Sequence, residues 1–531
     1  MNALYYGDNL TILREHVADE SVDLVYLDPP FNSQASYNVL FRAPEGHESH
    51  AQMEAFEDTW HWTDYAEKAF DEVMGSGNTD AAEMLRAMRS FLHDNDMMAY
   101  LAMMAVRLIE LHRVLKPTGS LYLHCDPTAS HYLKILLDAI FGKEFFKNEV
   151  VWRRSHPKGH AFTRFATSHD VIFYYVKNPG KAVWNQIYTP HDPETVTQQY
   201  SLTDPDGRRY QLTSLLNPNP DRPNLTYEFL GTTKVWRWTK ERMLEEHRKG
   251  RIVVPRGGKG IPRYKRYLDE QEGIPVGDFW GDIGIAAGEE RLGYPTQKPL
   301  ALLERIISAS SNEGDLVLDP FCGCGTTVHA AQKLNRQWIG IDITHLAISL
   351  IQKRLRDAFG PIPIDIHGTP KDLGGARALF NQKPNGPYQF QWWAVSLVDA
   401  VPFGGQKKGA DTGIDGLIYF KPDGKTTEKA IVSVKGGENV GVGMIRDLIA
   451  VVEREKAKMG VLLTLAEPTQ PMKKEAAGAG LYKTEYGEYP KVQIFTVADL
   501  FDGDRPRMPF IDSTVFRKAK REMKGTQQKL L

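Results

Sequence analysis

Short apolar runs alternate with stretches of helical period along the first 155 residues of the chain. Continuous apolar runs are typical of buried strands, and apolar residues three to four positions apart predict amphipathic helices. The expected strands are residues 4–6, 22–27, 120–124 and 149–153, and the expected helices are residues 95–115 and 132–141. Pro117 and Gly119 predict a helix stop and a turn over 115–119. Strands that alternate with helices indicate an α/β sheet with parallel pairing.

The alternation of predicted strands and helices stops after residue 155 and returns later. Residues 156–290 are rich in Pro, Gly, Asn, Arg and aromatic residues, with short strand-like pieces such as 171–176. Strands and helices resume between 298 and 356, and a separate α/β segment occupies about 388–502. The expected division is 1–155, 156–290, 291–358, a Pro/Gly-rich linker at 359–387, 388–510 and a basic tail at 511–531.

The composition is that of an ordinary globular protein with several domains. The chain has 531 residues, 42% hydrophobic and 25% charged, and no apolar run long enough to span a membrane. Its first residues lack the basic flank and apolar core of a secretion signal. Cys125, Cys322 and Cys324 are too few for a disulfide framework, so we expect a reducing compartment, the cytoplasm. Because the net charge is −2, any basic surface is expected to be local.

A glycine-rich turn follows the apolar residues 316–318. The turn spans residues 319–327, Asp-Pro-Phe-Cys-Gly-Cys-Gly-Thr-Thr, and a helix is expected to start near Thr326. Gly323 and Gly325 allow backbone angles and a close approach that a Cβ would prevent, which is typical of a nucleoside site. The two cysteines of the turn have no second Cys/His pair to complete a metal site and are interpreted as small turn residues.

Two carboxylates indicate which nucleoside this turn holds. Asp342 follows the expected strand 338–341, about twenty residues beyond the turn, where a carboxylate binds both ribose hydroxyls. The third glycine of the dinucleotide fingerprint is absent. Asp319, at the mouth of the turn, suits a positively charged amino-acid group, and S-adenosylmethionine carries both a ribose and an α-ammonium. Asp8, after the first strand, is a further candidate that would accept from the adenine amino group.

The segment Asp28-Pro29-Pro30-Phe31 follows another apolar run and predicts a catalytic site. An exocyclic amine on a base is a poor nucleophile because its lone pair is delocalised into the ring. The Asp28 carboxylate and the Pro29 carbonyl could accept its two hydrogens, Pro30 would hold the turn rigid, and Phe31 offers a face for stacking. Methyl transfer to a nucleic-acid base explains this segment together with the cofactor turn, and it requires the base to be flipped out.

Cations and aromatic residues are interleaved at three places in the variable region 156–290. They lie at residues 234–240, 248–251 and 263–267. This mixture suits phosphate neutralisation with stacking on bases. The alternative interpretation is a solvated basic face with Trp236 and Trp238 in a small core.

The ordered set of motifs resembles the β group of DNA amino-methyltransferases, in which the catalytic motif precedes the cofactor motif. The matching segments are residues 7–10, 28–31, 124–132, 294–299, 319–327 and 340–342. The resemblance implies a Rossmann-like, seven-stranded mixed sheet with permuted motif order and a target-recognition insert at 156–290. It further implies that Thr296, Gln297 and Lys298 line the cofactor pocket, together with Phe321 and Thr326.

The resemblance also bears on the substrate. Aspartate at position 28 favours N6 of adenine, since N4-cytosine enzymes more often carry Ser there; N4-cytosine methylation and methylation of RNA are the alternatives. The expected partner is double-stranded DNA, in a restriction–modification or defence system. A homodimer and a separate restriction or translocase subunit both fit the pattern, and this sequence has no GxxxxGK[ST] phosphate loop.

The C-terminal segment resembles restriction-endonuclease-like nucleases. Asp415 precedes the expected strand 430–434, which ends at Lys435. The resemblance implies that Asp415 binds Mg²⁺ and that Lys435 orients the attacking water. Ser433 replaces the expected carboxylate or amide, so the alternatives are a bifunctional methyltransferase–nuclease and a catalytically silent DNA-binding or assembly module.

Overall fold

The computed structural model describes residues 2–30, 36–42, 48–57, 61–155, 163–292, 297–382, 386–403, 413–423, 426–509 and 522. The chain forms two units, one from the residues up to Asn185 and from Asp278 onwards, the other from Gln186–Gly277. Within the described ranges, no helix has both the length and the apolar character that crossing a membrane requires.

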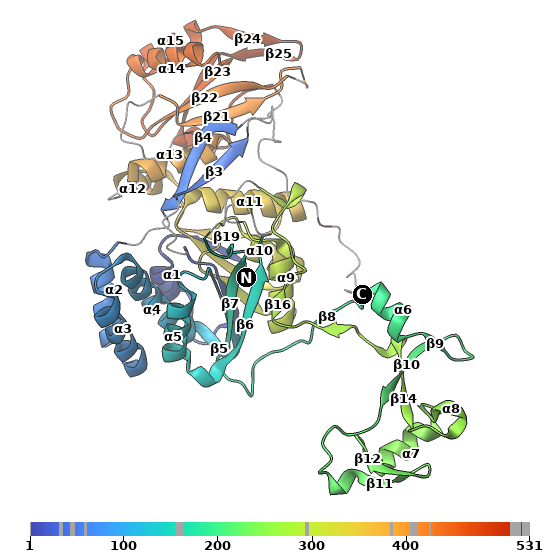
Figure 1. Ribbon diagram of the computed structural model, residues 1–531. Helices are drawn as coiled ribbons and strands as arrows, with labels where there is room; N and C mark the ends of the chain where they lie inside the picture. Colours follow the sequence, from blue (N-terminus) through green and yellow to red (C-terminus); the bar gives the residue numbers. More distant parts are fainter. Residues whose placement is uncertain are drawn as a thin grey trace. The chain divides into compact units, whose positions relative to one another are not determined.

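The first unit is built on a mixed sheet in the order β16-β6-β7-β5-β2-β17-β18-β1-β19 (Figure 1). β7 is antiparallel to β5 and β6, and the other neighbouring pairs are parallel. The bounds in chain order are β1 Ala3–Tyr6, β2 Val22–Leu27, β5 Leu115–Cys125, β6 Phe146–Arg153, β7 His169–Val176, β16 Phe279–Trp280, β17 Leu316–Asp319, β18 Gln337–Asp342 and β19 Asp365–His367. The seven strands implied by the resemblance are thus extended by the short edge strands β16 and β19.

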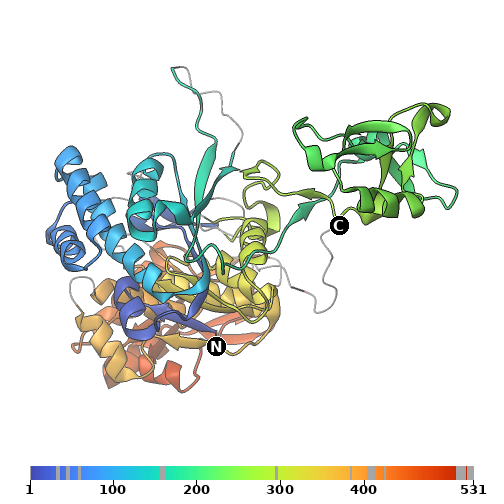
Figure 2. The same ribbon diagram turned by 90° about the horizontal axis from the view of Figure 1, so that it is seen from below.

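Side chains alternate between the two faces of the sheet along each strand. Because both faces carry buried residues, helices cover the sheet on both sides. Leu121 and Leu123 join a core with α1, α4 and α5, whereas Tyr122 points the other way and bonds Ser310 of α9. The blue and teal helices therefore lie together on one side (Figures 1 and 2). The bounds are α1 Asn9–His16, α2 Asp64–Gly75, α3 Thr79–Leu92, α4 Asp96–Val114, α5 Ser130–Phe141, α9 Leu300–Ser310, α10 Thr326–Lys333 and α11 His345–Phe359.

The helix stop predicted here is confirmed, because α4 ends at Val114, but the prediction of a turn over 115–119 is wrong. The chain passes from α4 directly into β5, whose pairing with β2 shifts register between Val22 and Leu24. A Cβ on Gly119 would lie 2.6 Å from a Leu115 methyl carbon and 2.9 Å from the Lys116 carbonyl oxygen. Gly119 therefore lies in an irregular part of a strand, where there is no room for a Cβ, rather than in a turn after a helix.

The variable region is narrower as a structural unit than the predicted 156–290. β7 is hydrogen-bonded between β5 and β6, and β16 pairs with β6, so both belong to the large sheet. The stretch 359–387, expected as a linker, contains β19, which pairs with β1, and α12, Leu373–Asn381.

The C-terminal domain holds its own sheet in the order β20-β21-β22-β23-β26. β22, β23 and β26 are parallel, and their apolar side chains pack against α13 on one face and α14 on the other. The bounds are α13 Gly386–Ser396, β20 Val401–Pro402, β21 Gly416–Phe420, β22 Glu428–Lys435, α14 Val442–Arg454, β23 Met459–Thr464, α15 Gln470–Gly478, β24 Leu481–Thr484, β25 Gly487–Pro490, β26 Val492–Thr496 and α16 Val497–Phe501. Two further strands, β3 Ser36–Arg42 and β4 Glu48–Glu57, pair with each other.

The second unit contains short strands around one small core. Trp236 is the largest residue of that core and is completely buried among Leu215, Phe229, Met243 and Ile252. The bounds are β8 Tyr188–Thr189, α6 Pro193–Gln199, β9 Leu202–Thr203, β10 Arg209–Ser214, β11 Thr226–Phe229, β12 Thr232–Val235, α7 Lys240–Arg248, β13 Ile252–Val253, α8 Pro255–Gly258, β14 Arg263–Tyr267 and β15 Ile274–Pro275.

Candidate active site

A cavity of about 270 Å³ lies where four parallel strands of the large sheet end. The carboxyl ends of β1, β2, β17 and β18 meet at this edge, which is where open α/β sheets bind ligands. The predicted site residues that line it are Asp8, Asp28, Pro29, Pro30, Gln297, Lys298, Asp319, Phe321, Gly323, Thr326 and Asp342. Segments almost 300 residues apart in the sequence therefore meet in one cavity.

The glycine-rich turn connects β17 to α10 as its sequence predicts. Gly323 and Gly325 have φ of +48° and +75°, a region that residues with a Cβ rarely adopt. A Cβ on Gly325 would also lie 2.6 Å from a side-chain carbon of Ile351. The turn is closed by the Gly325 amide, which donates to the Cys322 carbonyl at 2.7 Å. The backbone thus passes close to the cavity at the N-terminal end of α10.

Asp342 holds this turn against the end of β18. Its Oδ2 accepts from the Gly323 amide at 2.9 Å, and its Oδ1 accepts from the amide and hydroxyl of Thr344 at 2.9 and 2.8 Å. Burial raises the pKa of Asp342 to about 6, while these hydrogen bonds oppose the rise. The carboxylate retains free lone pairs at the cavity wall, since each oxygen can accept about two bonds.

Asp319 is buried at the mouth of the same turn and is only 3% exposed. Its Oδ1 accepts from the Phe321 amide at 3.0 Å. Burial raises the pKa of Asp319 to about 7, and the nearby carboxylates Asp28 and Asp342 raise it further against the hydrogen bonds that lower it. A cationic group placed in the cavity would relieve this cost.

Asp8 caps α1 and, although exposed itself, bonds the buried Arg107, which in turn bonds the buried Asn9. Its Oδ1 accepts from the Leu10 amide at 2.8 Å and from Arg107 Nη2 at 3.1 Å. Arg107 also donates to Asn9 Oδ1 at 2.7 Å, and Asn9 Nδ2 donates to the Pro320 carbonyl at 2.9 Å. Arg107 and Asn9 line the cavity as well, although neither was predicted. The signal for Arg107 is that it is the single charged residue of the apolar stretch 97–109.

Asp28 lies at the end of β2, and its two oxygens have different surroundings. Oδ2 forms an ion pair with Lys298. Oδ1 is buried and has no hydrogen-bond partner among the described residues. The Gln297 side chain, beside Lys298, is bonded to the backbone of residues 290–292. It accepts from the Leu292 amide at 2.7 Å and donates to the Glu290 carbonyl at 2.6 Å. Phe31 and Thr296, predicted as the stacking and cofactor residues, lie outside the described residues.

The aromatic residues of the second unit are placed differently from the stacking surface predicted. Trp236 is buried and donates through Nε1 to the Tyr227 carbonyl at 2.8 Å, so its indole offers no face to a base. Trp238 is half-buried, with Arg242 over its ring at 4.2 Å. The alternative interpretation, a small core containing both indoles, fits better, because Trp236 is fully buried and the half-buried Trp238 packs against the same core.

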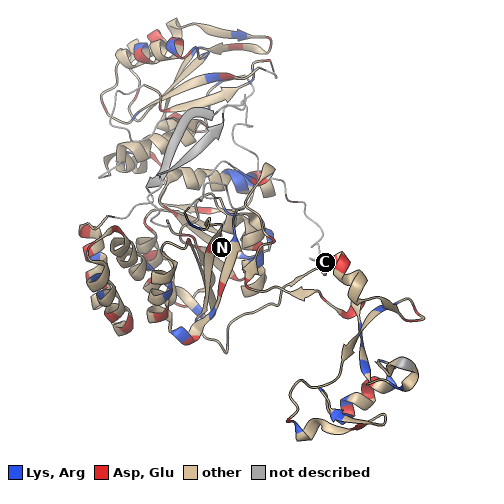
Figure 3. Cartoon of the chain, viewed as in Figure 1, with Lys and Arg blue, Asp and Glu red and all other residues tan. Residues whose placement is uncertain are grey.

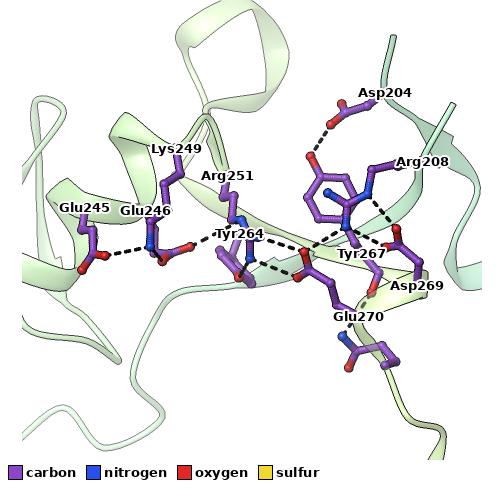
Figure 4. A network of polar contacts seen from close by, with 11 residues as sticks. Asp204, Arg208, Glu245, Glu246, Lys249, Arg251, Tyr264, Tyr267, Asp269 and Glu270 are labelled. Atoms are coloured by element: carbon purple, nitrogen blue, oxygen red, sulfur yellow. Dashed lines mark hydrogen bonds and ion pairs between the residues drawn. The ribbon is translucent and has the colours of Figure 1, made fainter. Parts of the chain in front are cut away.

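Some of the arginines of the second unit are neutralised by carboxylates of the same unit. Arg208 bonds Asp269 at 2.8 Å and Glu270 at 2.9 Å, and Arg251 bonds Glu270 at 2.8 Å (Figure 4). Basic and acidic residues are also mixed along α7 (Figure 3). The cations that stay exposed, such as Arg263 on β14, are the candidates for phosphate contacts.

In the C-terminal domain the Asp415 carboxylate is engaged by its neighbours. Oδ1 accepts from Gln391 Nε2 at 2.7 Å, and Oδ2 accepts from the Val434 amide at 2.5 Å and the Ser433 hydroxyl at 3.3 Å. Lys435 follows on the same face of β22 as Ser433. Among the residues that the structure describes, no group of three or more His, Cys, Asp or Glu side chains could hold a metal ion.

The sheet order and the cavity at its carboxyl edge are those of an α/β fold with a ligand site at the strand ends, and comparison with known proteins identifies the family. Residues 22–353 match the family model described as DNA methylase, of the N6/N4 type. Residues 400–502 match a model described as NACHT-associated inactive Restriction Endonuclease 1. The chain therefore belongs to the N6/N4 DNA methylase family and carries a C-terminal restriction-endonuclease-like domain.

Individual relatives support the assignment to the DNA methylase family. The type II methyltransferase M.EcaI of Enterobacter cloacae is 31% identical over 370 residues, 68% of this chain and 71% of the relative. The Mod subunit of the type III restriction-modification enzyme StyLTI of Salmonella typhimurium is 24% identical over 63% of this chain, which spans half of that subunit. The DNA adenine methyltransferase YhdJ of Escherichia coli is 24% identical over 66% of this chain and 82% of its own length.

Proposed function

We propose that this DNA methyltransferase transfers a methyl group from S-adenosylmethionine to N6 of adenine in double-stranded DNA. The observation that carries the proposal is the Asp28 carboxylate at the cavity wall. Lys298 fixes one of its oxygens, and the other is buried without a partner among the described residues. A buried acceptor of this kind is costly unless a ligand donates to it, and an exocyclic amino group does so.

The residues of the cavity fit S-adenosylmethionine. Asp342 has lone pairs left for the two ribose hydroxyls, and the buried Asp319 would bind the α-ammonium group. The turn at Gly323 lets the backbone approach the nucleoside, and Asp8 remains the proposed acceptor for the adenine amino group. When bound, the cofactor supplies an electrophilic methyl group on its sulfonium. Gln297 and Lys298 complete the wall.

The chemistry of the protein is one of positioning and electrostatics. Asp28 Oδ1 and the Pro29 carbonyl accept the two hydrogens of the target amine, which directs its lone pair away from the ring and towards the methyl group. Lys298 holds the carboxylate in place. The base reaches this cavity only when flipped out of the duplex, and Phe31 is proposed to stack on it. The insert Gln186–Gly277 is proposed to recognise the target sequence.

Adenine is proposed over cytosine on two grounds, because the family includes both N6 and N4 methyltransferases. Aspartate rather than Ser stands at position 28, and the relative YhdJ is named as a DNA adenine methyltransferase. N4-cytosine methylation is the alternative.

Transfer of a radiolabelled methyl group from S-adenosylmethionine tests the activity. We expect label in duplex DNA with the wild-type protein, and none with Asp28→Ala. An RNA duplex of the same sequence, tested in competition, separates DNA from RNA methylation. If the wild-type protein labels only RNA, or if Asp28→Ala keeps full activity, the proposed substrate or mechanism is wrong.

We further propose that the C-terminal domain is a catalytically silent module of a restriction–modification system in the cytoplasm. The Asp415 carboxylate is occupied by Gln391, Ser433 and Val434, and the matching family is described as inactive. Cleavage would then depend on a separate restriction subunit, as the likeness to a type III Mod subunit suggests. A nicking assay with Mg²⁺ or Mn²⁺ should show no cleavage by the wild-type protein or by Lys435→Ala; cleavage that Lys435→Ala abolishes would establish a nuclease.

A further inference from the structure

A buried chain of three polar side chains crosses three adjacent strands beside the cavity. The Tyr26 hydroxyl on β2 lies 2.9 Å from His124 Nδ1 on β5, and His124 Nε2 lies 3.2 Å from Asp170 Oδ2 on β7. The three residues are 2%, 0% and 1% exposed. Burying such groups is unfavourable unless they bond one another, so the chain is a specific feature of the fold.

Asp170 sets the direction of these hydrogen bonds. Burial would raise its pKa, but the hydrogen bond from His124 and nearby cations hold the pKa below the ordinary value. Arg154 Nη1, for example, lies 3.2 Å from Oδ1. An ionised carboxylate only accepts, so His124 Nε2 donates to it; in the tautomer that carries its proton on Nε2, Nδ1 is left as an acceptor. In this tautomer the Tyr26 hydroxyl donates its proton to Nδ1.

Tyr26 lines the cavity, and an oxygen whose proton points to His124 keeps its lone pairs as acceptors. Burial raises the pKa of Tyr26 well above its ordinary value, and the charges of Asp28, Asp319 and Asp170 add to the effect. Asp28, at the proposed amine side, and Asp319, at the proposed cofactor side, line the same cavity as Tyr26. Trp152 packs its ring against His124 from the side, with centroids 5.6 Å apart, and fixes the imidazole.

We infer that Tyr26 is a positioning residue for the transferred methyl group, oriented by His124 and Asp170. Its oxygen accepts C–H···O contacts from the methyl on the sulfonium, whose positive charge makes these hydrogens unusually good donors. Such contacts align the methyl with the incoming amine and distinguish the methylated cofactor from the demethylated product. This inference rests on the proposed function of the cavity and concerns groups that the comparison with relatives does not assign.

Binding measurements by calorimetry separate this role from a structural one. S-adenosylmethionine carries the methyl group and S-adenosylhomocysteine lacks it. We expect Tyr26→Phe to weaken binding of S-adenosylmethionine by about three- to tenfold and to leave binding of S-adenosylhomocysteine unchanged. The matched control is Tyr122→Phe, which removes another buried hydroxyl on the same sheet face, bonded to Ser310 at 2.7 Å. It should leave both affinities unchanged.

Asp170, at the far end of the hydrogen-bonded series Tyr26–His124–Asp170, gives a second and independent test. In Asp170→Asn the new amide can donate to His124 Nε2, so that Nδ1 carries the proton and the Tyr26 hydroxyl turns its own proton towards the cavity. We expect the same selective loss as in Tyr26→Phe, with no further loss in the double variant. If Asp170→Asn does not fold, His124→Asn replaces it, and Tyr26→Phe decides by itself.

The outcomes distinguish the two levels of the account. If the wild-type protein binds neither nucleoside, the proposed function of the cavity fails. If it binds both but Tyr26→Phe changes the two affinities equally, or changes neither, only the role of Tyr26 is overturned. Additive losses in the double variant would likewise overturn the orienting role of Asp170.

Discussion

Lys298 forms an ion pair with Asp28, although 270 positions separate them in the sequence. Asp28 directly follows β2, and Lys298 lies just before α9. The pair therefore connects the end of β2, on the proposed catalytic side of the cavity, to the segment before α9, on the proposed cofactor side. Both side chains are largely buried, with 16% and 11% exposure, so removal of either partner leaves an uncompensated charge at the cavity wall.

Replacing Asp28 tests catalysis separately from binding. We expect Asp28→Ala to lower kcat by at least about 100-fold, because the acceptor that positions the amine is lost. The Kd for S-adenosylmethionine should stay within about threefold. The control is Asp23→Asn, which alters another buried carboxylate of β2. Asp23 bonds Lys116 and is not among the residues that line the cavity. A parallel loss of cofactor binding in Asp28→Ala would assign the residue to the cofactor instead.

Replacing Asp342 should affect the cofactor first. Asp342→Ala removes the acceptor for the Gly323 amide and for Thr344, and with it the proposed ribose contact. We expect the affinity for S-adenosylmethionine to fall by about 10- to 100-fold, as loss of charged hydrogen bonds implies. Calorimetry measures this directly. An unchanged Kd would place the ribose elsewhere.

Cofactor binding should depend on pH through Asp319. Its carboxyl is half ionised near pH 7 without ligand, and a cationic ligand favours the ionised form. Below pH 7, binding must first remove the proton from the Asp319 carboxyl group. The affinity should therefore fall by up to about tenfold per pH unit as the pH drops from 7 to 6. Just above about pH 7.5 the affinity should not depend on pH. In Asp319→Asn binding is weaker, and only the slope below about pH 6 from Asp342 should remain. A pH-independent wild-type Kd would remove the ammonium contact.

Trp236 should support the insert rather than stack on DNA. Trp236→Ala empties the centre of the small core, and we expect a loss of about 3–5 kcal/mol in the stability of residues 186–277. Hydrogen exchange in this segment measures that loss locally. Substitution of the exposed residue Lys234 by Gln should leave exchange unchanged. Normal protection in Trp236→Ala would contradict the core assignment.

The salt dependence of DNA binding should distinguish exposed from neutralised cations. Arg263→Gln is expected to reduce the slope of log K against log salt by about one, if Arg263 contacts a phosphate. Arg208 is held by Asp269 and Glu270, so Arg208→Gln should leave the slope nearly unchanged (Figure 4). Equal slopes for all three proteins would exclude Arg263 from the interface.

Local patterns predicted the parts of the site that depend on strand ends. Asp28, Asp319 and Asp342 each follow an apolar run, and the carboxyl ends of parallel strands must meet at one edge, so their proximity could be expected. The cluster of Asn9 and Arg107 could not, because it depends on how α4 packs against α1.

Burial of polar and aromatic groups was the hardest feature to predict. The alternation of Trp236 with cations resembles a stacking surface, but the small unit lacks enough other apolar residues to form a core without it. Likewise, the Tyr26–His124–Asp170 chain spans three strands whose order follows from the sheet and not from any local motif.

Mass spectrometry of nucleosides tests the central claim most directly. Unmethylated duplex DNA is incubated with the protein and S-adenosylmethionine, then digested to nucleosides, with Asp28→Ala run in parallel. The account predicts N6-methyldeoxyadenosine from the wild-type reaction and none from the variant. N4-methyldeoxycytidine alone, or equal N6-methyldeoxyadenosine from both proteins, would contradict it.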